Sequence, residues 1–187
     1  MKREVSFVYV SDTATSNYKL LEKLYEKVSK KTNIKSEFVL ASPSEDYTNL
    51  NADINFASNK NNVICVKAKD NTLYSALRAA THVTNYGVSI LIKNLTEDTV
   101  ENFDLESVVD DMSNYTGFAV KETELGYGMK TFYMRSMVHD VKFSDANLYN
   151  EIMYTSCKKL EVARTERRSY KHYYAKGQLL NRLYGVV

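Results

Sequence analysis

Hydrophobic residues recur along the first third of the chain in patterns that predict a strand, a helix and a second strand. Residues 5–10 are β-branched and aromatic with an abrupt polar end, which is typical of a buried strand. Apolar residues then repeat at helical spacing and predict a helix over residues 17–31, with Leu20, Leu21, Leu24 and Val28 on one face. Residues 34–40 predict the second strand. Residues 44–62 are rich in Asn, Asp and Ser and are expected to form an irregular connection.

The same order of elements follows in residues 63–92. Residues 63–69 predict a strand, and Asp70 or Asn71 is expected to cap the helix that follows it. That helix is expected to end near Gly87, because glycine suits the C′ position. Its apolar face consists of Leu73, Ala76, Leu77, Ala80 and Val83. Residues 88–92 predict a further strand, and two strand-helix-strand units favour an α/β domain with parallel strand pairs.

The last part of the chain predicts helices and one hairpin. Residues 96–113 combine an apolar stripe with many acids and predict one or two helices. Two runs, 118–125 and 129–138, flank Gly126-Tyr127-Gly128 and predict a β-hairpin with a glycine-bearing turn. A long terminal helix is expected to begin at Ser144-Asp145. The predicted fold class is therefore α/β, with α+β as an alternative. It consists of a mixed sheet built from the two units and the hairpin, in a single domain 1–187 whose residues 144–187 form a C-terminal helical appendage.

Composition narrows the class of protein. The 187 residues are 44% hydrophobic and 12% aromatic, which excludes a disordered or fibrous chain. The apolar runs are too short to cross a bilayer. The two cysteines, Cys65 and Cys157, are interpreted as reduced, partly buried thiols. Since the amino terminus lacks the apolar segment of a secretory signal, we expect a cytoplasmic protein.

Charge is distributed unevenly, although the net charge is only +2. Residues 151–187 hold eight Lys or Arg and three Glu, so this segment carries a net charge of +5 and the remaining residues carry −3. Residues 95–111 hold seven acids and no base. Such polarity steers charged partners more than it determines the fold.

The most prominent candidate site lies in residues 164–176, where bases alternate with aromatic residues on the expected terminal helix. At helical spacing the bases lie on one side and the tyrosines gather on a neighbouring side. Guanidinium groups suit phosphates, and tyrosine rings suit stacking on bases or anchoring in a partner protein. In the opposite interpretation, the tyrosines pack on the sheet and the arginines merely face solvent. The candidate binding residues are Arg164, Arg167, Arg168, Tyr170, Lys171, Tyr173, Tyr174 and Lys176.

Signals for catalysis, metals or cofactors are sparse. The polar loop 11–17 resembles the phosphate loop of flavodoxins, but it contains no glycine, and Asp12 adds a negative charge. His82-Val83-Thr84 resembles one half of the paired H-x-[ST] signature of two-histidine phosphoesterases, whose second half is absent. No His or Cys pair has metal-binding spacing. We therefore predict no cofactor and no metal, and an enzyme would need Ser11, Asp12 or His82 to converge in a pocket.

The element order inferred for residues 63–138 resembles that of the Alba-like nucleic-acid-binding fold and of the C-terminal domain of translation initiation factor three. The resemblance rests on residues 63–69, the helix up to Tyr86 and the strand 88–92, without a diagnostic motif. It implies that Lys67 and Lys69 would face nucleic acid.

These patterns favour a non-enzymatic regulatory binding protein that acts on nucleic acid, or on a nucleic-acid-handling complex, through the basic, Tyr-rich helix. Enrichment in Asn, Lys, Ile and Tyr, without Trp and with a single Pro, is typical of AT-rich coding sequences such as those of low-GC bacteria and their phages. A phage-type inhibitor of host machinery such as a polymerase is therefore one alternative, with the acidic residues 97–111 imitating phosphate charge. A small α/β enzyme without a recognisable motif is the other.

Overall fold

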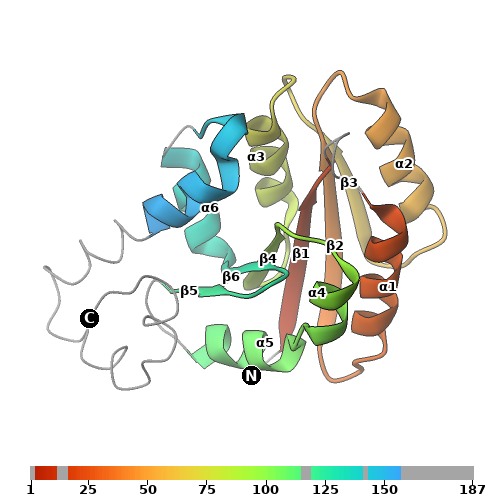
Figure 1. The fold of residues 1–187 in the computed structure, drawn as a ribbon, viewed down its shortest axis with the longest axis vertical. Coiled ribbons are helices and arrows are strands. Elements are labelled where there is room, and N and C mark those ends of the chain that lie inside the picture. The colour runs from red at the N-terminus through yellow and green to blue at the C-terminus, as the bar shows by residue number, and fades with distance from the viewer. Residues whose placement is uncertain (1–2, 12–16, 115–118, 141–142, 157–187) are drawn as a thin grey trace, which may run out of the picture.

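The computed structural model describes residues 3–11, 17–114, 119–140 and 143–156, which form a six-stranded mixed sheet with helices on both faces (Figure 1). The strands are β1 (Glu4–Val10), β2 (Lys35–Ser42), β3 (Val63–Lys67), β4 (Val88–Ile92), β5 (Val120–Glu122) and β6 (Gly126–Lys130). The helices are α1 (Tyr18–Ser29), α2 (Tyr47–Ala57), α3 (Leu73–Val83), α4 (Glu97–Asn102), α5 (Leu105–Asn114) and α6 (Thr131–Asp140). A 3-10 turn, η1 (Asp145–Asn147), leads into helical residues 148–156. The predicted α/β class with a mixed sheet is confirmed.

The order of strands in the sheet is β3-β2-β1-β4-β6-β5. The first four strands are parallel, and β6 runs antiparallel to both β4 and β5. The chain order reverses at β1, because α1 and α2 lead outward to β2 and β3, whereas α3 returns the chain across the sheet to β4. This reversal makes β1 and β4 the topological switch point, where doubly wound sheets have a crevice outside the carboxyl ends of the strands.

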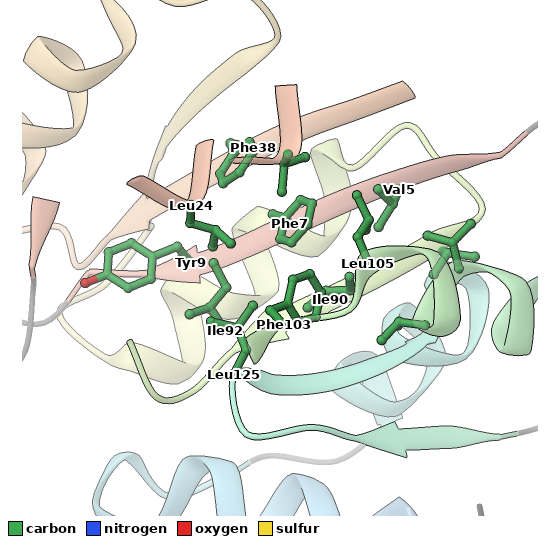
Figure 2. Packing of buried hydrophobic residues seen from close by; sticks show 14 of the residues in the cluster. Val5, Phe7, Tyr9, Leu24, Phe38, Ile90, Ile92, Phe103, Leu105 and Leu125 are labelled. Carbon is green, nitrogen blue, oxygen red and sulfur yellow. The ribbon is translucent and has the colours of Figure 1, made fainter. Parts of the chain in front are cut away.

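Side-chain alternation along the central strands divides the core into two layers. On one face of the sheet, alternate residues such as Phe7 and Phe38 pack under α1, α2, α4 and α5 (Figure 2). The rings of these two phenylalanines are stacked with centroids 4.7 Å apart. On the other face, Val8, Val39 and Leu91 pack under α3, α6 and the segment that ends in residues 148–156. No helix within the described ranges is long and apolar enough to span a membrane.

Helix α2 corrects the expectation of an irregular connection over residues 44–62. Its buried face holds Asn49 and Asp53 beside Phe56, so that no apolar repeat marks the helix in the sequence. Asp46 caps the first turn by accepting a hydrogen bond from the Asn49 backbone N–H at 3.0 Å. The helix is therefore fixed to the sheet by polar contacts as well as by apolar burial.

The hairpin is present, but its position differs from the prediction. The turn between β5 and β6 spans residues 123–125, and Gly126 lies at the start of β6. Residues 131–138, expected as part of the second arm, belong to helix α6. A Cβ atom at Gly126 would lie 2.0 Å from the Leu91 carbonyl oxygen. Glycine is therefore required here for the close approach of β6 to β4 and not for a turn.

The expected ends of α3 are wrong by a few residues. Thr72 is the N-cap instead of Asp70 or Asn71, and its hydroxyl accepts a hydrogen bond from the backbone of the first turn. The C-cap is Thr84, so Gly87 does not occupy the C′ position. Threonine is among the residues preferred at the N-cap, and the Thr72 backbone is already in the extended region.

The element order inferred for residues 63–138 is present, as β3, α3, β4, the two helices α4 and α5, β5 and β6, although residues 131–138 belong to helix α6 and not to the last strand. These strands do not form a sheet of their own, because β2 and β1 lie between β3 and β4. Lys67 lies at the end of the edge strand with its ammonium 4.7 Å from the centroid of the Tyr47 ring.

Candidate functional site

The predicted binding residues lie outside the described residues, as do Cys157 and Asp12. These binding residues are Arg164, Arg167, Arg168, Tyr170, Lys171, Tyr173, Tyr174 and Lys176. The structure does describe the segment that leads into them, the acidic region, and two of the residues named for catalysis. We call residues 151–187 the basic region and residues 97–111 the acidic region.

Apolar burial anchors the start of the basic region on the layer of α3 and α6. Leu148, Ile152 and Ser156 are buried there. The Ser156 hydroxyl donates a hydrogen bond to the Ile152 carbonyl oxygen at 2.7 Å and lies 3.3 Å from the sulfur of Met137 on α6. The chain therefore enters the basic region from a fixed position on the protein.

A carboxylate ties the same segment to the N-terminus of α3. Asp145 accepts hydrogen bonds from the backbone N–H groups of Leu73 and Tyr74, at 2.9 and 3.0 Å. N–H groups in the first turn of a helix have no partner within the helix, and a negative charge also suits the positive end of the helix dipole. Tyr74 donates its own hydroxyl to the Val138 carbonyl oxygen at 2.7 Å. These contacts join α3, α6 and the terminal segment into one unit.

The acidic region is folded against α1. Four acids of this region form ion pairs with bases elsewhere in the chain. Three lysines spaced four residues apart along α1 and just after it make most of the contacts. These contacts join Lys23 to Glu97 (2.7 Å), Lys27 to the Val100 and Glu101 carbonyl oxygens (2.9 and 2.6 Å), Lys31 to Glu106 (2.8 Å), Arg3 to Asp110, and Lys121 to Asp111. Surface ion pairs contribute about 0–1 kcal/mol each, so they orient the acidic region more than they stabilise it. They also occupy carboxylates that a basic partner would need.

A buried polar cluster lies at the carboxyl ends of β1 and β2. Asp53 of α2 is fully buried and accepts hydrogen bonds from three hydroxyl groups: those of Ser11 and Tyr18 at 2.7 Å each, and that of Ser42. Burial raises the pKa of Asp53, and the three hydroxyl donors partly oppose the rise. Desolvation likewise raises the pKa of Tyr18. The cluster ties α1 and α2 to the strand ends beside the switch point.

Ser11 and His82 lie at opposite ends of the sheet. Ser11 follows β1 at the carboxyl edge, and its hydroxyl is bonded to Asp53. His82 lies in the last turn of α3, which returns the chain to the amino end of β4. The structure therefore does not bring these two residues into one pocket, which was the arrangement that the enzyme hypothesis required.

Lys93, which follows β4 at its carboxyl end, is bonded to the protein itself. The Lys93 ammonium donates to the Tyr127 hydroxyl at 2.9 Å and lies 5.3 Å from the centroid of that ring. Burial raises the pKa of Tyr127, and the neighbouring ammonium opposes the rise. The pair fixes the turn after β4 against β6.

A cleft of about 250 Å³ lies between α1 and the start of α5. Its floor is apolar and its rim is charged; the residues that line it are Lys27, Val28, Lys31, Phe103, Asp104 and Leu105. Both lysines already bond to α4 or α5, as described above. An incoming anion would therefore have to compete with existing bonds for both lysines of the cleft.

Within the described ranges, no group of three His, Cys, Asp or Glu residues is arranged to hold a metal ion. Cys65 is a free thiol whose sulfur donates to the Asp53 carbonyl oxygen at 3.2 Å. Burial raises the pKa of this thiol to about 11. Since the thiolate is the reactive form, Cys65 is a poor nucleophile at neutral pH.

Sequence reasoning missed a second buried polar cluster, which lies near the amino ends of β1 and β2. Glu37 accepts hydrogen bonds from the Ser6 hydroxyl at 2.5 Å and from the backbone and side-chain N–H groups of Asn85 at 2.6 and 2.8 Å. Ser6 and Glu37 occupy matching positions in the register of β1 and β2. A polar residue at the same point of two adjacent buried strands is the signal that could have identified the pair.

No family model matches the sequence, and no curated protein matches it either. Among solved structures, the chain is similar to the bifunctional IspDF from Campylobacter jejuni, with a TM-score of 0.42 and 9% sequence identity. The match covers 80% of this chain and 47% of that chain, so this chain spans less than half the length of that protein. The likeness concerns only the arrangement of helices and strands.

Proposed function

We propose that the protein is a non-enzymatic regulatory binding protein that contacts nucleic acid, or a complex that handles nucleic acid, through the basic region. In this proposal Arg164, Arg167, Arg168 and Lys171 pair with phosphates, and Tyr170, Tyr173 and Tyr174 stack on bases, with Lys176 adding charge. The α/β layers serve as a platform for this region.

The separation of charge between the two layers is the observation that carries the proposal. The acidic helices α4 and α5 pack on the face of the sheet that holds Phe7 and Phe38, whereas the anchor of the basic region packs on the opposite face. The basic region has a net charge of +5 and the rest of the chain −3. In this proposal the basic region extends from the face opposite the acidic helices, so that a polyanion approaches that face and is kept away from the acidic one.

The alternatives have less support from the described residues. In the acidic region, a partner drawn to phosphate-like charge would have to compete with bases of the same chain for four carboxylates, whose side chains are 40–68% exposed. Catalysis by Ser11 with His82 requires these residues to meet, and they lie at opposite ends of the strands.

The salt dependence of binding tests the proposal. Fluorescence anisotropy would measure the affinity of the full chain for labelled single-stranded and duplex DNA of mixed sequence at several salt concentrations. We expect log K to fall linearly with log salt. A variant with Arg164, Arg167, Arg168 and Lys171 replaced by Gln should lose a slope of about 3 to 4, since each phosphate contact contributes about 0.7–0.9.

A matched variant separates the site from the net charge. Replacement of four exposed lysines elsewhere by Gln removes the same charge; these are Lys19, Lys30, Lys35 and Lys69. We expect this variant to keep the wild-type slope. Equal losses in the two variants would show attraction by net charge alone, and binding that does not change with salt would exclude phosphate contacts altogether; either result contradicts the proposal.

A further inference from the structure

The helices on the two faces of the sheet differ in charge. Helices α3 and α6 lie side by side on one face (Figure 1), and the one acid that they contain is Asp140, the last residue of α6. Helices α4 and α5, on the other face, contain three acids each and no base. Arg78 of α3 and Arg135 of α6 are both exposed. The face that carries the anchor of the basic region is therefore the face that repels a polyanion least.

One aromatic ring on this face is exposed to solvent. Phe132, in the first turn of α6, is 73% exposed, the largest value among the exposed large hydrophobic residues of the described ranges. Its ring meets that of Tyr133 edge to face, with centroids 5.6 Å apart and planes at 71°. This contact orients the Phe132 ring and leaves most of it uncovered. Since burial of a phenylalanine stabilises a fold and Phe132 is not buried, its ring is available to a ligand.

A guanidinium group lies beside this ring and is held in place. Arg135 follows Phe132 by three residues, and side chains at this spacing are neighbours on a helix surface. Its Nε donates to the Thr81 carbonyl oxygen at 2.7 Å, and its Nη2 donates to the Thr84 carbonyl oxygen at the end of α3. The two N–H groups of Nη1 make no bond to the described part of the chain. A phosphate can therefore bind Nη1 without breaking the contacts that hold Arg135.

The basic region begins close to this ring and guanidinium. Ser156, where the described residues end, lies 3.3 Å from the sulfur of Met137. Met137 follows Phe132 by five residues, which is about 7.5 Å along the axis of α6. Arg164 comes eight residues after Ser156, a span of at most about 29 Å. Nucleic acid that is held by the basic region can therefore reach α6.

We infer that Phe132 is a stacking site for an unpaired base and that Arg135 binds a neighbouring phosphate, so that the nucleic acid this protein binds is single-stranded. The basic region supplies most of the charge, so this inference rests on the proposed function. Stacking on an aromatic ring tolerates any sequence, because every base has a π-face. In a duplex those faces are covered by the neighbouring base pairs, and a ring on a protein surface does not reach them. Charge attracts both forms, and the ring selects the single strand.

Tryptophan fluorescence tests the stacking site, because the chain contains no Trp. Phe132→Trp places one indole at the site. Tyr47→Trp is the matched control, at a ring of α2 that is 61% exposed on the opposite face of the sheet. When the full chain is titrated with single-stranded DNA of mixed sequence and about 16 nucleotides, stacking should quench the first indole and not the second. The same sequence as a duplex should quench neither.

Affinities measured by fluorescence anisotropy test the selection of single strands. Phe132→Ala should weaken binding to the single strand by about 5- to 150-fold, the range expected for loss of one stacked base, and should leave duplex binding unchanged. Its salt dependence should remain that of the wild type, because no charge is removed. Tyr47→Ala should bind both forms as the wild type does. Both rings are exposed, so neither substitution should alter folding, which thermal melts check.

The phosphate contact of Arg135 has a test of its own, because this residue also holds the end of α3. Arg135→Gln should reduce the slope of log K against log salt on the single strand by about 0.7, the contribution of one phosphate. Lys19→Gln removes the same charge from an exposed position on α1 and should keep the slope. A lower melting temperature with an unchanged slope would restrict Arg135 to a structural role and contradict the contact.

The two proposals fail in different ways. Equal quenching of the two indoles, or a Phe132→Ala variant whose single-strand affinity is unchanged or falls no further than its duplex affinity, would overturn the stacking site even where the salt dependence is as proposed. An indole at position 132 that is shielded from water before DNA is added would also overturn it, because another part of the chain or a second copy would then cover the ring. Failure of the proposed function is instead a wild-type affinity that does not change with salt.

Discussion

Replacement of Asp53 tests how strongly the buried polar cluster stabilises the carboxyl edge of the sheet. The carboxylate is fully buried and accepts hydrogen bonds from Ser11, Tyr18 and Ser42. In Asp53→Ala three buried hydroxyls lose their acceptor, and each bond to a charged group is worth about 1.5–3 kcal/mol. Because such losses are not additive, we expect about 3–5 kcal/mol in total. Asp53→Asn keeps one acceptor oxygen, and its cost should be about 1–2 kcal/mol.

Urea unfolding followed by far-UV circular dichroism measures these changes in the free energy of unfolding. Melting temperatures shift by about 2–4 °C per kcal/mol for a chain of this size, so Asp53→Ala should melt about 6–20 °C below the wild type. The control is Asp98→Asn, at an exposed position of α4, which should stay within about 0.5 kcal/mol of the wild type. Equal effects at the two positions would refute the argument that the cluster stabilises the fold.

The pH dependence tests the cause of the raised pKa of Asp53. A raised pKa means that the protonated form of Asp53 is more favourable, relative to the charged form, in the folded state than in the unfolded state. The stability gained from that proton is complete below the ordinary aspartate pKa of about 3.9 and is lost as pH rises through the raised value. The free energy of unfolding of the wild type minus that of Asp53→Asn should therefore fall as pH rises above about 4. A difference that is constant or grows with pH would refute burial as the dominant cause.

Two further predictions concern the backbone and the terminal anchor. Gly126→Ala should destabilise the protein by about 3 kcal/mol or more, because its Cβ would meet the Leu91 carbonyl oxygen, whereas Gly87→Ala has open space and should be neutral or stabilising by up to about 1 kcal/mol. Thermal melts of the two variants compare them directly, and similar melting temperatures would contradict the close approach of β6 to β4. Asp145→Ala removes the carboxylate that accepts two hydrogen bonds from the first turn of α3 and should cost about 1 kcal/mol in chemical unfolding, with faster amide exchange at Leu73 and Tyr74; unchanged exchange there would contradict a stabilising role of these bonds.

Elements with regular apolar spacing were predictable from the sequence. β1 and β4 are buried on both faces and are rich in β-branched and other apolar residues, as parallel central strands are. Helix α1 shows its four buried residues at helical spacing, and Asn17 caps it as the polar loop before it suggested. In these elements local propensity and tertiary burial favour the same structure, so the pattern is sufficient.

Helix α2 was missed because its interior face is polar. Asn49 and Asp53 are buried, so the apolar repeat that identifies a helix is absent. Asp53 has partners on other elements, and the Asn49 side chain donates to Asp46 at the N-cap of the same helix. The residues of β6 were misread for a related reason. Gly126 indicates a turn when the sequence is considered alone, but the neighbouring strand requires it. In both places the deciding interaction joins residues far apart in the chain, which local patterns do not contain.

The candidate binding site in the basic region could be predicted only as a pattern of basic and aromatic residues. The spacing of Arg164, Arg167 and Arg168 identifies one side of an expected helix, and these residues lie outside the described ranges. The structure adds the position from which the chain enters the region, through the buried Leu148 and Ile152. Sequence periodicity did not identify this anchor, because Asp145 and the first turn of α3 are distant in the chain.

The buried carboxylates of the body have structural partners that limit any role in proton transfer. Both oxygens of Glu37 accept hydrogen bonds, from Ser6 and Asn85, and both oxygens of Asp53 accept bonds from hydroxyl groups. A general base must have an oxygen within reach of its substrate, and three of the about four acceptor sites of each carboxylate are already used inside the protein. Each cluster instead joins neighbouring strands to the helix or loop beside their ends.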